Sequence, residues 1–321
     1  MLTFRANASA RVRQRRGSRL AWLSAFTAVS VVTLGLTSIT PALATPAKPP
    51  TDWSFYVLST STSTAYTLGC NQGDYDASHS DANSEVFLDF GGQISGGTEL
   101  INGTDVSNGT IESIAEQFAS GYWVCTGADT TSNLNLAIGT NNSLDVGTSY
   151  GETWAGVVNA VTTWVADDAG QVSVWGGDDI EPGFGSESAA IAWSNGFGDD
   201  TSALYLNYGS ADGCPESSYG NGGCNNGWDQ YDVWYVSWGS APAVTAPEIY
   251  ESAQASQWTM ICLYGANHQS GEVFYQGPLD ENDLDSGTYT SAQAWDALEN
   301  DLNAHSSCAQ TMPYSLEVHD E

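Results

Sequence analysis

Three carboxylates stand within four positions of one short stretch, VWGGDDIEPGFG (174–185). Asp178, Asp179 and Glu181 follow an apolar run directly and precede a Pro-Gly pair. Side chains alternate along an extended segment, so Asp179 and Glu181 share one side and form the better pair. One carboxyl of such a pair can give a proton while the other attacks or activates water. We expect Glu181, crowded by anions, to have a raised pKa and act as general acid beside Asp179; for Asp178 a solvated side chain is an equal alternative.

Polar or aromatic side chains also follow several other apolar runs. Asp89 stands in FLDFGG, Asn141 and Asn142 follow LNLAIGT, and Asp212 stands in YGSADGC. If these runs are parallel strands, their carboxyl ends meet at one rim, so Asp89 and Asp212 become supporting carboxylates. We expect Trp175, Asn141 and Trp238 to contact the substrate, since carboxylates and flat aromatic faces together are typical of sugar hydrolysis. The alternatives are that Asp89 and Asp212 only accept backbone N–H groups in turns, and that most tryptophans are core.

Other catalytic chemistries have weaker signals in this chain. No two of the four histidines are spaced four apart on a helix, and no G-x-S-x-G elbow occurs. The acidic segment DENDLDSG (280–287) lacks the glycine and the register of an EF-hand loop. We therefore predict no cofactor and no metal, with calcium as an alternative on acidity alone.

Eight apolar runs bounded by Gly, Asn or Ser predict the strands that would position these residues. They are 53–59, 85–91, 122–127, 134–140, 171–177, 203–209, 232–239 and 258–265. Helical spacing of apolar residues predicts helices over 109–121, 152–170, 187–197, 247–258 and 290–306. Strands alternating with helices predict an α/β fold, a single (β/α)8 TIM-like barrel domain over 52–321. An all-β sandwich is the alternative.

The charge of the chain is distributed very unevenly. Six of the seven basic residues lie in residues 1–44, whereas all 38 acidic residues come later. After residue 44 a single lysine, Lys48, therefore faces 38 acids, which gives a formal charge of −37. Nucleic acids and phosphorylated ligands lack a cationic clamp here, and lysine Schiff-base chemistry is excluded. We expect stability to rise at moderately low pH, or with salt or divalent cations, because self-repulsion then falls.

The N-terminal segment has the pattern of a secretory signal peptide. Six arginines precede an apolar stretch (21–36) and an Ala-Leu-Ala site (42–44). A retained anchor is the alternative; we expect no membrane insertion of the mature chain. A Pro-rich linker (45–51) follows. Secretion favours disulfides: Cys214 with Cys224 around a Gly-rich loop, then Cys262 with Cys308 and Cys70 with Cys125, with zinc as the alternative.

Several motifs together resemble secreted bacterial proteins that carry a glycoside hydrolase-like barrel. They are VFLDFGGQ, IGTNNS, WGGDDIEP, ALYLNYGSADGCP and DVWYVSWG. The step Asp179-Ile180-Glu181 is distantly similar to the strand-end D-x-E of family 25 muramidases. This resemblance implies that Asp179 and Glu181 are catalytic, although the muramidase acidic triplet at the first strand is absent.

The function expected from the sequence is thus a secreted, monomeric glycoside hydrolase-like protein that acts on polysaccharide or cell-wall glycan, with carbohydrate as its partner. The first alternative is a non-catalytic carbohydrate-binding protein on the same barrel. The second is a secreted structural or surface protein whose rim carboxylates are only solvated.

Overall fold

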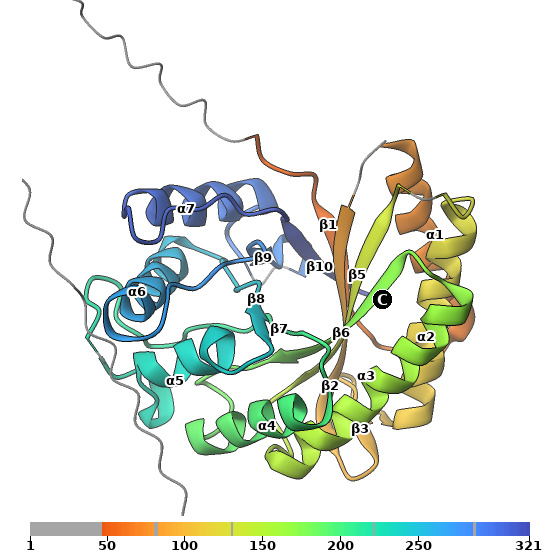
Figure 1. Ribbon diagram of the computed structural model, residues 1–321, viewed down its shortest axis with the longest axis horizontal. Helices are drawn as coiled ribbons and strands as arrows, with labels where there is room; N and C mark the ends of the chain where they lie inside the picture. Colours follow the sequence, from red (N-terminus) through yellow and green to blue (C-terminus); the bar gives the residue numbers. More distant parts are fainter. Residues whose placement is uncertain (1–46, 80–82, 130, 221, 285–286) are drawn as a thin grey trace, which may run out of the picture. The chain divides into compact units, whose positions relative to one another are not determined.

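Eight parallel strands form the central sheet of this protein (Figure 1). The computed structural model describes residues 47–321 except 80–82, 130, 221 and 285–286. The predicted signal peptide, residues 1–44, lies outside the described residues. The strands are β1 (Asp52–Tyr56), β2 (Asn83–Ile94), β3 (Gly97–Glu99), β4 (Asp105–Ser107), β5 (Asn133–Asn141), β6 (Val172–Asp179), β7 (Tyr205–Asn207), β8 (Ala243–Thr245), β9 (Leu279–Asp280) and β10 (Leu316–Asp320).

The strand order is β8-β7-β6-β5-β2-β1-β10-β9, and every neighbouring pair in it is parallel. The two short strands β3 and β4 extend β2 as an antiparallel meander. Parallel neighbours bring their carboxyl ends to the same edge of the sheet. This edge is therefore where side chains that follow the strands can meet.

Helices pack around the strands, with α1–α3 and α5–α7 on opposite sides in the view of Figure 1. They are α1 (Thr62–Ser78), α2 (Asn108–Cys125), α3 (Thr148–Asp168), α4 (Glu187–Asp200), α5 (Gln230–Trp234), α6 (Ser252–His268) and α7 (Ser291–Asn303). Five of them begin after a side chain that accepts a backbone N–H of the first turn, as helix caps do. The capping residues are Ser61, Ser107, Ser186, Asp229 and Thr290.

The two faces of the sheet contribute to different apolar clusters. On β2, Val86 and Leu88 pack with residues of the helices, such as Phe118. Phe87, which alternates with them, belongs to a second cluster built from the strands, together with Leu316. Strands buried on both faces have continuous apolar runs, which is why the sequence of β2 shows no alternation.

Helix α1 was not predicted because its sequence is polar and carries two glycines on one side. A Cβ at Gly69 would lie 1.9 Å from the carbonyl oxygen of Phe118 in α2, so only glycine allows this approach. The disulfide between Cys70 and Cys125 joins the same two helices. Close backbone packing, rather than an apolar stripe, therefore holds α1 in place.

Three of the eight predicted strands are wrong. Residues 122–127 form the end of α2 and the turn after it. Residues 232–239 belong to α5 and the π-helical turn Tyr235–Gly239, and residues 258–265 lie inside α6. Short apolar runs fit a buried helix as well as a buried strand, and α6 buries nine residues. The strands that replace them, β8, β9 and β10, have only three, two and five residues. The predicted helix 247–258 begins only at Ser252, so residues 247–251 are a loop.

The predicted α/β class with parallel strands is confirmed, and the all-β alternative is wrong. The end strands β8 and β9 do not pair with each other as strands among the described residues. All three predicted disulfides are present, Cys70–Cys125, Cys214–Cys224 and Cys262–Cys308. In the described part of the chain no helix is long and apolar enough to cross a bilayer.

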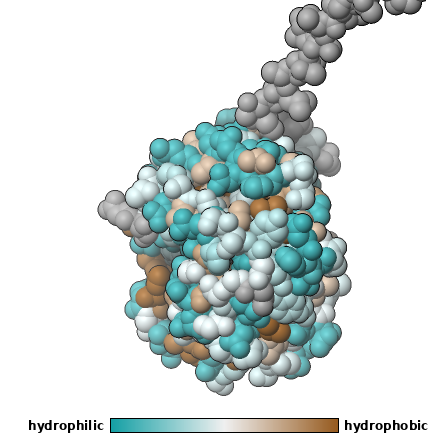
Figure 2. Space-filling model, turned by 90° about the vertical axis from the view of Figure 1, so that its left-hand side faces the viewer, coloured by the Kyte–Doolittle hydropathy of each residue, from teal (hydrophilic) through white to brown (hydrophobic). Residues whose placement is uncertain are grey.

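The face of the molecule drawn in Figure 2 is mainly polar. Figure 2 shows one face on which small apolar areas are separated by hydrophilic residues. Lys48 is the only lysine or arginine among the described residues, so the acidic side chains have almost no cationic partners.

Candidate functional site

A cavity of about 250 Å³ opens at the carboxyl ends of the strands. Residues from the ends of β1, β5 and β6, from within β2 and from the segments after β8 and β9 line it, which is where parallel sheets place their sites. Its lining is Tyr56, Asp89, Gly91, Ile101, Asn141, Asp179, Glu181, Phe184, Glu248, Tyr250 and Glu281. Five of these eleven residues are acidic and none is basic, and we call this cavity the carboxylate pocket.

Three of the acids meet at one point of the carboxylate pocket. Asp179 is the last residue of β6, Glu181 stands two residues later, and Glu248 stands in the loop after β8. Each can offer one carboxylate oxygen such that these oxygens lie within 4.8 Å of one another. Asp179 is only 6% exposed, and its Oδ1 has no hydrogen-bond partner among the described residues. The site thus contains a buried acceptor oxygen that the protein itself does not satisfy.

The three carboxyls hold protons unusually strongly. Burial, and then the charges of Glu248 and Glu181, raise the pKa of Asp179 well above its ordinary value. Burial, followed by the charges of Glu181 and Glu281, does the same for the pKa of Glu248. The pKa of Glu181 is raised by burial and then by Asp212. Without a nearby cation, these groups must be neutralised by protons or by a bound ion.

Asp89 stands at the bulge of β2 on the wall of the pocket. Its Oδ1 accepts the backbone N–H of Gly91 at 2.5 Å, whereas its Oδ2 has no partner among the described residues. Burial raises the pKa of Asp89 to about 6. Asp89 therefore accepts a backbone N–H in a turn, as the alternative from the sequence had it, and its second carboxylate oxygen remains free to bind a ligand. Across the pocket, the hydroxyl of Tyr56 donates to Glu281.

The loop that carries Glu181 is fastened to its neighbours by side-chain hydrogen bonds. Asn142 donates to the carbonyl oxygen of Glu181 at 3.1 Å and accepts its N–H at 3.0 Å. Asn226 donates to the carbonyl oxygens of Pro182 and Gly183 at 2.7 and 3.1 Å. The indole of Trp228 donates to the carbonyl oxygen of Gly185 at 2.8 Å. These bonds fix the loop, so the position of the Glu181 carboxyl is defined.

The strands under the pocket need glycine at one position in particular. Tyr208 stacks on Phe87 with ring centroids 4.2 Å apart and donates its hydroxyl proton to the carbonyl oxygen of Thr140 at 2.8 Å. A Cβ at Gly139 would lie 2.2 Å from that hydroxyl oxygen. Glycine in β5 therefore makes room for the aromatic ring that closes the space below the acids.

Four of the residues predicted from the sequence, Asp89, Asn141, Asp179 and Glu181, line the pocket together. Asp212 lies beside it rather than in its lining: a Cβ at Gly183 would be 2.7 Å from its Oδ2 and 3.6 Å from an oxygen of Glu181. The catalytic roles given to these residues stay predictions.

The two predicted tryptophans lie elsewhere. Trp175 packs in the cluster built from the strands, and Trp238 packs against Phe274 with ring centroids 5.4 Å apart. Neither lines the carboxylate pocket. Asp178 is 1% exposed, so the solvated alternative is wrong for it; alternation places it on the other face from Asp179.

The residues missed by sequence reasoning are Glu248, Tyr250 and Glu281, with Tyr56 at the end of β1. The sequence predicts a helix whose first turn contains Glu248 and Tyr250, whereas in the structure these residues follow the three-residue strand β8. The signal that could have found them is the run Ala243-Val244-Thr245 before Pro247-Glu248, which resembles the strand-then-acid pattern of β6.

No family model and no curated protein matches this sequence. A solved structure from Labrenzia alexandrii DFL-11, described as a mandelate racemase/muconate lactonizing enzyme, matches with 13% identity and a TM-score of 0.42. The match covers 83% of this chain and 53% of that chain, so this protein spans about half the length of that one.

The comparison corrects the predicted glycoside hydrolase. The matching structure is named for a different enzyme, and no family model or curated protein supports the resemblance drawn from the motifs. The glycosidase prediction is therefore abandoned. At this identity and TM-score, no activity of the matching enzyme is assigned to this chain; the α/β architecture rests on its own strand order.

Proposed function

We propose that the carboxylate pocket binds a hard divalent cation, such as Ca²⁺, Mg²⁺ or Mn²⁺, through Asp179, Glu181 and Glu248. The observation that carries this proposal is the buried Oδ1 of Asp179, which has no hydrogen-bond partner among the described residues and belongs to the three-carboxylate group. Oxygen-only ligand sets suit these ions. Calcium, weighed above on acidity alone, here has a defined set of ligands.

The charge of the pocket supports the same conclusion. Five acidic residues line a small cavity, and none of its lining residues is basic. Three deprotonated carboxylates around one ion would replace mutual repulsion by attraction. The hydroxyls of Ser210 and Tyr250 lie beside the carboxyls of Glu181 and Glu248, so further oxygen atoms are within the site.

A cation at this point would determine what else binds. The cavity of about 250 Å³ is below the usual ~300–1,000 Å³ of ligand pockets, so it suits a small molecule. Ile101 and Phe184 are exposed at its wall and provide apolar contact. We propose that the ion orients an oxygen-bearing ligand of this size. Carbohydrate as the partner, and a monomeric state, stay predictions.

The test measures cation binding by calorimetry and by thermal unfolding. Wild-type protein is titrated with Ca²⁺, Mg²⁺ and Mn²⁺ at pH 7.5, beside Asp179→Asn and Glu248→Gln. We expect at least one ion to bind once per chain and to raise the melting temperature, and each variant to lose tenfold or more in affinity. Glu152→Gln, an exposed change on α3, is the control and should bind as wild type does.

The alternative to a bound cation is a proton shared between the same carboxyls. If the side chains of Glu181 and Glu248, which are hydrogen-bonded to each other, only share a proton, no ion binds and Glu248→Gln raises stability at neutral pH. Unchanged melting temperatures with all three ions, together with a stabilised Glu248→Gln, would therefore refute the cation site.

We also propose that the sheet closes into a barrel between β8 and β9. Two isolated parallel bridges, Thr245 with Tyr275 and Glu248 with Leu279, support this closure. The N–H of Ile249 donates to the carbonyl oxygen of Leu279 at 2.8 Å. Closure here would attach the Glu248 segment to the rest of the rim.

We also propose that the protein is secreted. Three disulfides are compatible with an extracellular protein, because such bonds persist in oxidising compartments. Mass spectrometry of the protein exported by an expressing bacterium should find a mature N-terminus at Thr45 if the predicted Ala-Leu-Ala site is used.

A further inference from the structure

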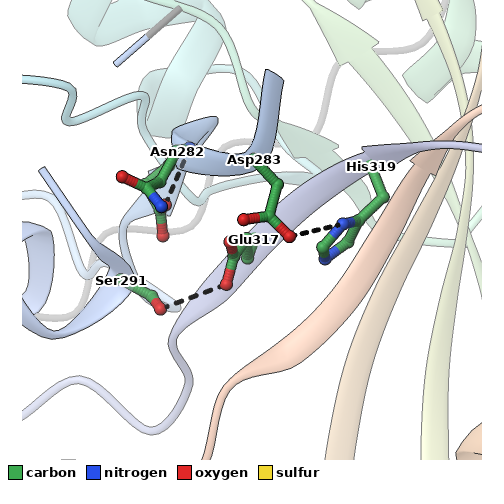
Figure 3. A network of polar contacts seen from close by, with 6 residues as sticks. Asn282, Asp283, Ser291, Glu317 and His319 are labelled. Atoms are coloured by element: carbon green, nitrogen blue, oxygen red, sulfur yellow. Dashed lines mark hydrogen bonds and ion pairs between the residues drawn. The ribbon is translucent and has the colours of Figure 1, made fainter. Parts of the chain in front are cut away.

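A second group of possible metal ligands lies outside the carboxylate pocket and shares no residue with it. Asp283 belongs to the 3-10 turn Asn282–Leu284 after β9, and Glu317 and His319 stand two apart on β10 (Figure 3). Leu316 and Val318 face the strand-built cluster, so Glu317 and His319 point to the opposite side. One ligand atom from each of the three lies within 4.8 Å of the others.

The spacing of these atoms fits metal coordination better than hydrogen bonding. Nδ1 of His319 and Oδ2 of Asp283 are 3.4 Å apart, whereas a charged N–H···O bond is usually about 2.7–2.9 Å. Two ligands on tetrahedral zinc, each about 2.1 Å from the ion, are separated by about 3.4 Å. An ion could thus sit between these atoms with little movement of either side chain.

Within the described part of the chain, no short hydrogen bond ties the side chains of Glu317 and His319 to other partners. The Oε2 of Glu317 accepts the hydroxyl of Ser291 at 3.4 Å, the outer limit for such a bond. The Nε2 of His319 is buried and has no hydrogen-bond partner among the described residues. The imidazole is therefore held mainly by its ring contacts, with Trp53 at 5.4 Å and Phe55 at 6.3 Å between centroids.

The surroundings of the group are strongly anionic. Asp280, fully buried on β9, pairs with Glu317 in register and so shares its face of the sheet. Its Oδ2 has no hydrogen-bond partner among the described residues. Lys48, the only lysine or arginine among the described residues, interacts with Asp280 and Glu317, and its single positive charge does not balance three acids. A divalent ion would supply the missing charge.

A large cavity adjoins the group. It has a volume of about 620 Å³, and Asp283 and His319 belong to its wall together with Trp53, Phe55 and Tyr75. Three protein ligands leave one tetrahedral position open. A metal held here would border an aromatic-lined space large enough for a small organic ligand.

We propose that Asp283, Glu317 and His319 form a binding site for a borderline divalent metal ion, with zinc as the representative. One imidazole nitrogen and two carboxylate oxygens suit Zn²⁺, Co²⁺, Ni²⁺ and Cu²⁺, whereas Mg²⁺ and Ca²⁺ prefer oxygen alone. This preference separates the site chemically from the oxygen-only carboxylate pocket. The proposal does not depend on the function proposed for that pocket.

The test uses untagged, metal-free protein and the side-chain nitrogen resonances of its four histidines. Zn²⁺ is added stepwise in the presence of excess Mg²⁺, and binding is measured in parallel by calorimetry. We expect the first equivalent to shift the His319 signals alone. His319→Gln should lose that equivalent, and Asp283→Asn and Glu317→Gln should each weaken it tenfold or more. His268→Gln, an exposed change on α6, is the matched control.

One further measurement and a second variant keep the outcome decisive. The melting temperature of each variant without metal shows whether that variant is folded. If His319→Gln does not fold, the zinc affinity of Asp283→Asn, a change on an exposed side chain, tests the site instead. The proposal is overturned if folded variants keep the zinc equivalent, or if zinc shifts the other histidines equally. It is also overturned if Glu248→Gln removes the zinc equivalent, because the ion then lies in the carboxylate pocket.

Discussion

Asn142 holds the backbone of Glu181 with both ends of its amide, donating to the carbonyl oxygen at 3.1 Å and accepting the N–H at 3.0 Å. Asn142 follows β5 and Glu181 follows β6, so this pair joins two neighbouring strand ends. Asn142 is 1% exposed, and the two bonds are therefore shielded from water. The position of one proposed cation ligand depends on a residue that does not line the pocket.

Removing this amide should loosen Glu181. We expect Asn142→Ala to lower the free energy of unfolding by about 1–3 kcal/mol, because buried backbone groups lose their partners. Cation affinity in the carboxylate pocket should fall as well, measured by calorimetry. Asn303→Ala, which removes one exposed bond to Gln310, is the control and should leave cation affinity unchanged. Equal affinities for Asn142→Ala and wild type would contradict the positioning role.

Gly209 gives a way to displace Asp179 without changing a charged group. A Cβ at Gly209 would lie 2.7 Å from Oδ1 of Asp179 and 2.5 Å from the carbonyl oxygen of Ile180. We expect Gly209→Ala to weaken cation binding several-fold, with some loss of melting temperature from the backbone shift. Gly156→Ala has open space on α3 and should keep the affinity while raising stability by up to about 1 kcal/mol. A Gly209→Ala protein with wild-type affinity would show that Oδ1 is not a ligand.

Cation binding in the carboxylate pocket should release protons. Burial and neighbouring charges raise the pKa values of Asp179 and Glu248, so these groups carry protons that an ion must displace. Affinity should therefore fall as the pH is lowered, by up to tenfold per pH unit for each displaced proton. Calorimetry in two buffers of different ionisation enthalpy counts the protons. An affinity independent of pH between 5 and 8 would mean that the carboxyls are already ionised.

The sequence predicted the inner part of the fold well because the long strands are distinctive. β2, β5 and β6 contain long apolar runs, and Asp89 within β2 does meet Asn141 and Asp179 at the ends of β5 and β6. The pairing of Asp179 with Glu181 follows from alternation alone. These features are local, so local pattern is sufficient to find them.

The strands β8 and β9 and the pocket residues that follow them could not be predicted from local sequence pattern. β8 has three residues and β9 has two, too few to show a period, whereas α6 is buried on most sides and resembles a strand. Glu248 and Glu281 follow these two short strands, so they were missed together. Their positions depend on tertiary contacts, such as the bridge between Glu248 and Leu279, two residues that are 31 positions apart in the sequence.

The stability of the protein should rise as the pH falls from 8 towards 4. Burial raises the pKa of Asp52 to about 7 from an ordinary value of 3.8. Between these two pH values the folded chain binds more protons than the unfolded chain, so stability decreases as the pH rises through this window. Asp89, with a pKa raised to about 6, and Asp280, with a pKa raised to about 7, act in the same direction.

Asp52→Asn should remove one part of this slope. The amide oxygen can still accept the N–H of Glu85, which Asp52 binds at 3.0 Å, and it carries no charge at any pH. We expect a melting temperature that depends less on pH, with the largest gain over wild type at pH 8, measured by calorimetry from pH 4 to 8. Asp105→Asn, on an exposed side chain of β4, is the control and should keep the wild-type slope. A wild-type melting temperature that is flat over this range, or an unchanged slope in Asp52→Asn, would refute the buried proton at Asp52.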